Sequence, residues 1–207
     1  MAGSSTDRVP ARPPTSPAVA HFFFDLASPA AYVAAERALQ VLPGVEWVPV
    51  LARELPGTES FEAFRCAEER DIALAEIERA AATHGLPALR WPDPFPFDSL
   101  FAMRVATYAK QIGRTVPFAL AAFRQAFAGG RSLAEPDNVV IAAAACEMHP
   151  AAVLKAAELR GVRAALDAAT ARAVALGVRD VPAVWTGEHV FHGQAELERA
   201  AAAMVVA

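Results

Sequence analysis

Cysteine is scarce in this sequence. Only Cys66 and Cys146 are present, and neither belongs to a Cys-x-x-Cys pair, so the chain lacks the local motif of dithiol–disulfide exchange. Both lie within helical patterns, where a thiol behaves as a small apolar group. We therefore predict two buried, reduced cysteines in a cytoplasmic protein, with a disulfide between them as the open alternative.

Long apolar runs and basic clusters are also missing. No stretch of 18 uncharged apolar residues occurs, which argues against a membrane protein. The net charge is −4 and no Lys/Arg block is present, which argues against nucleic acid as a partner. Residues 1–18 are rich in proline and lack the apolar core of a secretory signal, so we predict a disordered tail there.

Two further kinds of catalytic site have no sequence support. No Gly-x-Ser-x-Gly motif is present, so a serine hydrolase is not indicated. His189 and His192 are three residues apart in a predicted hairpin and should point to opposite faces, where they could not share a metal ion. We predict no metal site.

The first third of the chain predicts a strand, a helix and a second strand. Residues 19–26 form a nearly unbroken apolar run, typical of a strand buried on both faces. Ser28 and Pro29 suit the N-cap and first turn of a helix that reaches Leu42, and residues 45–50 read as the next strand. A right-handed crossover would make the two strands parallel.

The middle of the chain contains no convincing strand and predicts helices. Four prolines and three aromatic residues between Leu86 and Phe97 favour a stiff, irregular loop over an apolar surface. The predicted helical segments are Phe61 to His84, a segment from Asp98 or Ser99, Pro117 to Phe127, Pro136 to Met148, Pro150 to Leu159 and Val162 to Leu176.

The last thirty residues predict two strands joined by a tight turn, then a helix from Gln194 to Met204. Pro182 stands at the mouth of the first of these strands, which suggests either an edge strand or a cis Val181–Pro182 bond. A cis bond would leave the Val181 amide and carbonyl free for a ligand. The fold class is therefore α/β. The sheet and its helices come from 19–56 and 177–207, and a helical insertion spans 57–176.

Three places could hold ligand chemistry. The Ser28 hydroxyl lies beside the amides of a helix start, which favour a thiolate or carboxylate, although an ordinary N-cap explains it equally. Gln194, Ala195 and Glu196 open the last helix and could receive a carboxylate or simply cap that helix. His192 could line a pocket or be an ordinary histidine at a strand end.

Four segments together resemble a known family. They are Phe24-Asp25-Leu26-Ala27-Ser28-Pro29-Ala30-Ala31-Tyr32, Ser99-Leu100-Phe101-Ala102-Met103-Arg104, Gly177-Val178-Arg179-Asp180-Val181-Pro182 and Phe191-His192-Gly193-Gln194. These motifs occur in the order found in the DsbA-like thioredoxin superfamily, and within it they are similar to the branch of 2-hydroxychromene-2-carboxylate isomerase and kappa-class glutathione transferase. The resemblance covers residues 20 to 205.

The resemblance implies a thioredoxin fold interrupted by a helical insertion. Ser28 would stand where redox members carry their first catalytic cysteine and would stabilise the thiolate of glutathione or another small thiol. Val181 and Pro182 would form the cis-proline loop that pairs with this cofactor, and Gln194, Ala195 and Glu196 would receive its γ-glutamyl carboxylate.

The implied activity is thiol-dependent isomerisation or transfer on a small unsaturated or aromatic acid. We expect the substrate pocket to include Tyr32, Trp91, Phe101 and His192. An alanine-rich surface is consistent with a homodimer. The usual Asn-x-Pro-Pro loop is absent, and Ala195 replaces the usual aspartate. Two alternatives therefore stay open: a non-catalytic thiol or small-molecule binding protein, and a disulfide oxidoreductase by ancestry only.

Overall fold

The computed structural model describes residues 19–57 and 67–206. The tail predicted at 1–18, Cys66 and the predicted helix start at Phe61 lie outside these ranges. Within them, no helix is both long enough and apolar enough to cross a bilayer.

Four strands form one mixed sheet in the order β2-β1-β3-β4. The parallel pairing of the first two strands, expected from the crossover helix, is confirmed, and the other neighbours are antiparallel. Phe22 lies opposite Trp47 on one side and Val184 on the other. The strands are β1 (His21–Phe24), β2 (Glu46–Pro49), β3 (Ala183–Trp185) and β4 (Val190–His192).

Strand β1 is buried on both faces, as its apolar run predicts. Successive side chains of a strand point to opposite faces. Phe22 and Phe24 therefore enter the larger core with Trp47, while Phe23 enters a second, smaller core with Val48. All three phenylalanines are at most 1% exposed, and burying each contributes about 1.5–3 kcal/mol.

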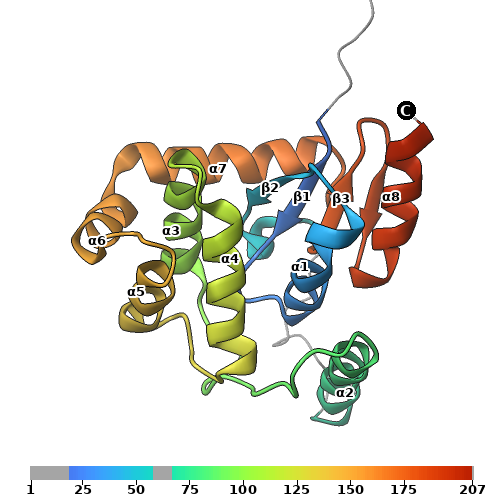
Figure 1. Cartoon of the computed structure of the whole chain (residues 1–207), viewed down its shortest axis with the longest axis horizontal. Coiled ribbons are helices and arrows are strands. Elements are labelled where there is room, and N and C mark those ends of the chain that lie inside the picture. Colours follow the sequence, from blue (N-terminus) through green and yellow to red (C-terminus); the bar gives the residue numbers. More distant parts are fainter. Residues whose placement is uncertain (1–18, 58–66, 207) are drawn as a thin grey trace, which may run out of the picture.

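Helices cover the two faces of this sheet (Figure 1). Helices α1 (Pro29–Val41) and α8 (Leu197–Val206) supply the larger core, whereas α7 (Arg160–Ala175) places Ala169 and Ala173 against Phe23 on the second face. A short 3-10 turn, η4 (Gln194–Glu196), precedes α8.

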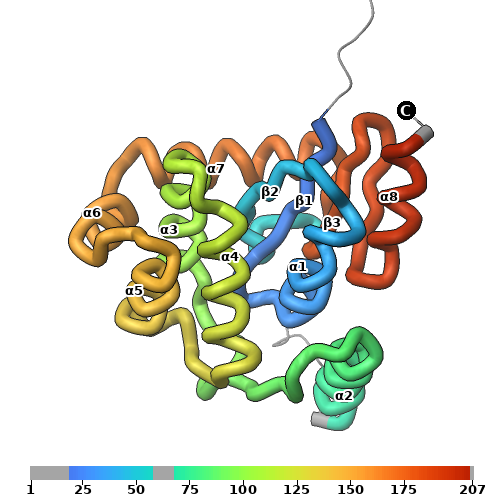
Figure 2. Tube along the Cα trace, in the orientation of Figure 1, coloured from blue at the N-terminus to red at the C-terminus, as the bar shows by residue number. Residues whose placement is uncertain are grey.

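A helical insertion lies between β2 and β3, as predicted, and no strand occurs among its described residues. Residues 86–97 form no regular element and run between α2 and α3 (Figure 2). The elements are η1 (Ala52–Glu54), α2 (Ala67–Thr83), α3 (Leu100–Gln111), α4 (Thr115–Phe123), the π-helical turn η3 (Arg124–Ala128), α5 (Pro136–Ala144), α6 (Pro150–Glu158) and α7.

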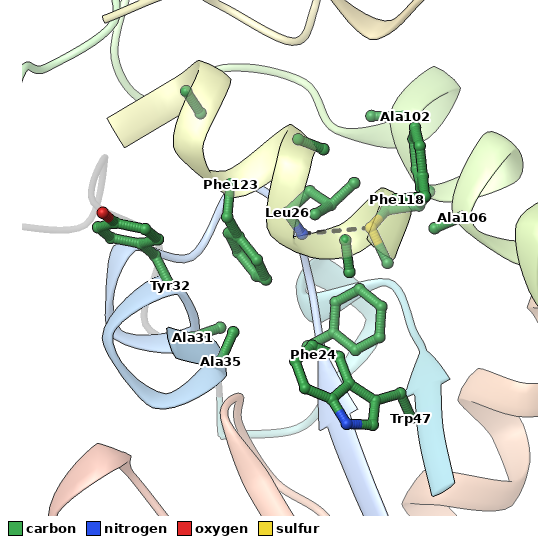
Figure 3. Packing of buried hydrophobic residues seen from close by; sticks show 14 of the residues in the cluster. Phe24, Leu26, Ala31, Tyr32, Ala35, Trp47, Ala102, Ala106, Phe118 and Phe123 are labelled. Atoms are coloured by element: carbon green, nitrogen blue, oxygen red, sulfur yellow. Dashed lines mark hydrogen bonds between the residues drawn. The ribbon is translucent and has the colours of Figure 1, made fainter. Parts of the chain in front are cut away.

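The insertion and the sheet share one core (Figure 3). Phe24 of β1 packs 5.9 Å from Phe123 of α4, measured between ring centroids. The Leu26 amide, just past β1, points to the Met103 sulfur of α3 at 3.2 Å. These contacts fix the end of β1, and with it the start of α1, against the helical insertion.

Candidate functional site at the start of helix α1

Ser28 is the N-cap of α1, as its sequence predicts. Its hydroxyl oxygen accepts a hydrogen bond from the Ala31 amide at 3.2 Å, and Pro29 occupies the first helical position. The hydroxyl also lies 3.4 Å from the Val181 carbonyl oxygen, to which it donates. Ser28 is half-buried. The two residues lie 153 positions apart in sequence, and this contact brings them into one site.

A buried carboxylate holds the turn that presents Ser28. Asp25 is 2% exposed, and its two oxygens accept hydrogen bonds from the Ala27 and Ala52 amides, each at 2.9 Å. Burial raises the pKa of Asp25, while these bonds and one from Ser99 oppose the rise. Because its donors come from the turn, from η1 and from the residue before α3, Asp25 ties three segments together beneath Ser28.

The Val181–Pro182 bond is cis, as we predicted, but its backbone groups are not free. The Val181 amide donates to Asp180 Oδ1 at 2.7 Å, and the Val181 carbonyl accepts from Ser28. The expectation that both groups await a ligand is therefore wrong. A carboxylate inside the chain takes the place that a ligand carbonyl would need.

The segment after η1 is fixed to the same loop. The Gly57 amide donates to the Arg179 carbonyl at 2.7 Å. A Cβ on Gly57 would lie 2.9 Å from Arg179 Cβ and from its carbonyl oxygen. Only glycine permits this approach, because the second obstacle is backbone. The segment that contains Gly57 and the loop that contains Arg179 are thereby held together.

The Gly193–Gln194 turn lies on the other side of the loop. The Gly193 amide donates to the Pro182 carbonyl at 2.8 Å, and Arg37 of α1 donates to the Gln194 carbonyl at 2.8 Å. The structure thus brings Pro182 and Gln194 near α1. Gln194, Ala195 and Glu196 form the turn η4, so α8 begins later than predicted, at Leu197. The Glu196 side chain pairs with Arg199.

His192 supports the loop from the end of β4. Its Nε2 accepts a hydrogen bond from the Arg179 amide at 3.0 Å. Burial and the Arg179 charge lower the pKa of His192, against the effect of Asp180, and a neutral ring suits its role as acceptor. The contact that the structure shows for His192 is with the chain itself.

Two of the predicted aromatic residues, Tyr32 and Trp91, lie beside Phe127 of η3. Tyr32 is fully buried with its ring 5.8 Å from that of Phe127, and the Trp91 ring lies 6.3 Å from the same residue. Among the residues that the structure describes, the buried Tyr32 hydroxyl has no hydrogen-bond partner, whereas the Trp91 indole donates to Glu78 at 2.7 Å. Phe101, on α3, is half-buried at the edge of the core.

Within the described ranges the other site chemistries have little support. Cys146 is buried, as expected, and burial raises the pKa of its thiol, which disfavours the reactive thiolate. No group of three His, Cys, Asp or Glu residues in those ranges could hold a metal ion.

A comparison with family models decides the family. Residues 19–205 match the DSBA-like thioredoxin domain. The chain belongs to this family. The match spans nearly the whole described structure, so the DsbA-like fold includes the helical insertion as well as the sheet. No curated protein matches the sequence.

Solved structures share this DsbA-like fold. 2-Hydroxychromene-2-carboxylate isomerase has a TM-score of 0.80 at 16% identity, covering 91% of this chain and 95% of its own. A probable DsbA oxidoreductase from Streptomyces coelicolor has a TM-score of 0.74 at 22% identity, covering 90% and 88%. The cytosolic disulfide reductase DsbM from Pseudomonas aeruginosa, solved with GSH, has a TM-score of 0.62 at 15% identity, covering 91% and 96%.

Two residues of this DsbA-like site escaped sequence reasoning. Asp25 could have been noticed as the one charged residue in the apolar run 19–26, just after β1. Asp180 carried no signal of its own, because an aspartate in a loop is normally solvated and its bond to the next amide depends on its rotamer.

Proposed function

We propose that this DsbA-like protein is a thiol-dependent isomerase or transferase acting on a small unsaturated or aromatic acid. The observation that carries the proposal is the hydroxyl of Ser28, presented at the start of α1 and directed to the cis-proline loop. The fold likeness to 2-hydroxychromene-2-carboxylate isomerase and the GSH in the DsbM structure support the class.

The residues around Ser28 fit a bound thiolate. The Ser28 hydroxyl makes a long bond of 3.4 Å to Val181, so it can turn toward a sulfur anion at little cost. The positive end of the α1 dipole favours negative charge at the same place. A serine at this position can hold a thiolate but cannot form a disulfide, which disfavours oxidoreductase chemistry.

A bound thiol would supply a sulfur nucleophile that adds to an electrophilic carbon of a conjugated acid, and then leaves after bond rotation or stays in the product. In this scheme Ser28 donates a hydrogen bond to the sulfur and keeps it ionised. Asp25 keeps the turn rigid, so that the hydroxyl stays in place. Arg37 holds the Gln194 turn against α1.

A second candidate is a thiol or small-molecule binding protein without catalysis. The bond between the Val181 amide and Asp180 favours it, because that amide is already paired. A cofactor that pairs with the loop backbone would have to displace the Asp180 carboxylate. Catalysis therefore requires that this carboxylate rotate away when the cofactor arrives.

Calorimetric titration with glutathione tests the proposal on the wild type and on two variants. Ser28→Ala removes the hydroxyl and should weaken binding about 10- to 100-fold, because hydrogen bonds to charged groups contribute about 1.5–3 kcal/mol. Ser28→Thr keeps a hydroxyl and should bind nearly as the wild type does. S-methylglutathione, whose sulfur cannot become a thiolate, should bind both variants alike. If no small thiol binds the wild type, the proposal fails.

If glutathione binds and Ser28→Ala weakens it, turnover decides between the two candidates. Wild-type protein with glutathione should isomerise a conjugated cis-enone acid or form its thiol adduct, followed by absorbance. Binding without either reaction across a panel of such acids would favour the non-catalytic candidate.

A further inference from the structure

Two cavities lie side by side along the edge strand β2, far along the sheet from Ser28. Their volumes are about 340 and 260 Å³, and both are lined by Glu46, Lys110 and Ala169. His21 borders the smaller cavity and begins β1, whereas Ser28 follows the other end of that strand. We call the smaller cavity, with its rim of Glu46, Lys110 and Arg172, the edge groove.

A buried histidine borders the edge groove. His21 is 8% exposed, and its ring stacks on Trp185 with centroids 5.3 Å apart. Its Nδ1 lies 3.1 Å from Glu46 Oε2, within ion-pair distance but without the geometry of a well-formed hydrogen bond. Buried polar atoms are normally hydrogen-bonded, so among the described residues Glu46 is a strained partner for this nitrogen.

The charges around the edge groove do not balance. Glu46 is paired with Lys110, which also donates to the Trp47 carbonyl. The side chain of Arg172, exposed on the last turn of α7, makes no ion pair or hydrogen bond with any described residue. One guanidinium is therefore left to attract an anion. Burial and the charges of Arg172 and Lys110 lower the pKa of His21, against the effect of Glu46, so its ring adds little charge.

The floor of the edge groove is apolar. Phe23 and Val48 line it from the sheet, and Ala168 and Ala169 line it from α7. A ligand that fits must therefore combine one negative charge with a small apolar body. A second negative charge would be repelled by Glu46, which makes a carboxylate a better match than a phosphate.

We propose that the edge groove is a second ligand site, which binds a small organic carboxylate with its charge on Arg172 and its apolar body against Phe23 and Val48. A guanidinium matches the two oxygens of a carboxylate in a planar, bidentate pair. The volume of about 260 Å³ lies just below the usual range of ligand pockets and limits the ligand to about the size of a single ring. This site does not depend on the function proposed for Ser28.

Binding of the ligand should change the pKa of His21. Three charged groups face this ring, namely Glu46 of β2, Lys110 of α3 and Arg172 of α7. A bound carboxylate adds negative charge and offsets Arg172, so the pKa of His21 should rise when the edge groove is filled.

Histidine side-chain NMR of the full chain, with benzoate as the probe, tests the site. Benzoate should shift the His21 resonances saturably and raise the pKa of His21, and the neutral benzamide should bind at least about tenfold more weakly. Inorganic phosphate should also bind more weakly. The His192 resonances report the Ser28 region separately, so benzoate bound there is recognised as a different event.

Two arginine variants test whether Arg172 supplies the positive charge that binds benzoate. Arg172→Gln should weaken benzoate binding at His21 at least about tenfold, whereas Arg160→Gln, at the other end of α7, should leave it unchanged. Ser28→Ala should also leave it unchanged, so this site and the proposed function can fail separately. An unsaturable His21 response, equal binding of benzamide or phosphate, or equal loss in both arginine variants would overturn the proposal.

Discussion

The buried carboxylate beneath Ser28 gives the sharpest structural prediction. Asp25 Oδ1 and Oδ2 each accept one backbone amide at 2.9 Å, from Ala27 and Ala52. In Asp25→Asn only one oxygen is left, so the new amide NH₂ must face one of these N–H donors. An unsatisfied buried donor costs about 1–3 kcal/mol, and we expect a loss of that size in the free energy of unfolding.

Urea denaturation measures this loss, with Asp98→Asn as the matched control. Asp98 is exposed and pairs with Arg53, and an asparagine there can still accept the Leu100 amide. The control should therefore change stability by less than about 1 kcal/mol. Equal stability of Asp25→Asn and wild type in mild acid would refute the account of the turn.

The pH dependence of the same variant tests the state of Asp25. Burial raises its folded pKa above the ordinary value of 3.8, so the folded protein binds the proton more tightly than the unfolded chain. The stabilisation from that proton is complete below the unfolded pKa and is lost as pH rises through the folded pKa. The difference in free energy of unfolding between wild type and Asp25→Asn should therefore narrow as pH rises from the unfolded to the folded pKa of Asp25. A gap that widens as pH rises would contradict the raised pKa.

Three more predictions concern neighbouring residues. Tyr32→Phe removes a buried hydroxyl that has no partner among the described residues, and it should leave stability unchanged or raise it by about 1 kcal/mol in urea denaturation; a clear loss would show that the hydroxyl has a partner. Gly57→Ala places a Cβ 2.9 Å from the Arg179 carbonyl and should lower the thermal midpoint, at a cost of about 1–3 kcal/mol; an unchanged midpoint would show that the two segments part easily. His192 has a lowered pKa, so its contribution to the free energy of unfolding is complete above pH 6.5 and is lost as pH falls through its folded pKa. The NMR signal of the Arg179 amide should shift as His192 is protonated, and a signal that does not change would exclude the hydrogen bond between them.

Local sequence patterns predicted the elements around Ser28 well. The apolar run at 19–26 became β1, and the Ser28–Pro29 pair became the start of α1, because strand burial and helix capping depend on nearby residues. The cis bond at Val181 and the family also followed from the motifs.

Contacts that depend on rotamers or on distant segments could not be predicted. The Asp180 side chain reaches the Val181 amide, and nothing in the sequence distinguishes this rotamer from a solvated one. The edge groove depends on how β2, α3 and α7 pack, so His21 and Arg172 appear unrelated in the sequence. The start of α8 shifted to Leu197 because residues 194–196 form a tighter 3-10 turn.

The ionisation of bound glutathione, followed by thiolate absorbance in the ultraviolet, tests the central claim most directly. If Ser28 holds a thiolate, the pKa of the bound thiol lies below that of free glutathione. Ser28→Thr keeps this lowered value, and Ser28→Ala reduces the thiolate-to-thiol ratio about 10- to 100-fold at a given pH. A bound thiol with the same pKa in wild type and Ser28→Ala would contradict the account.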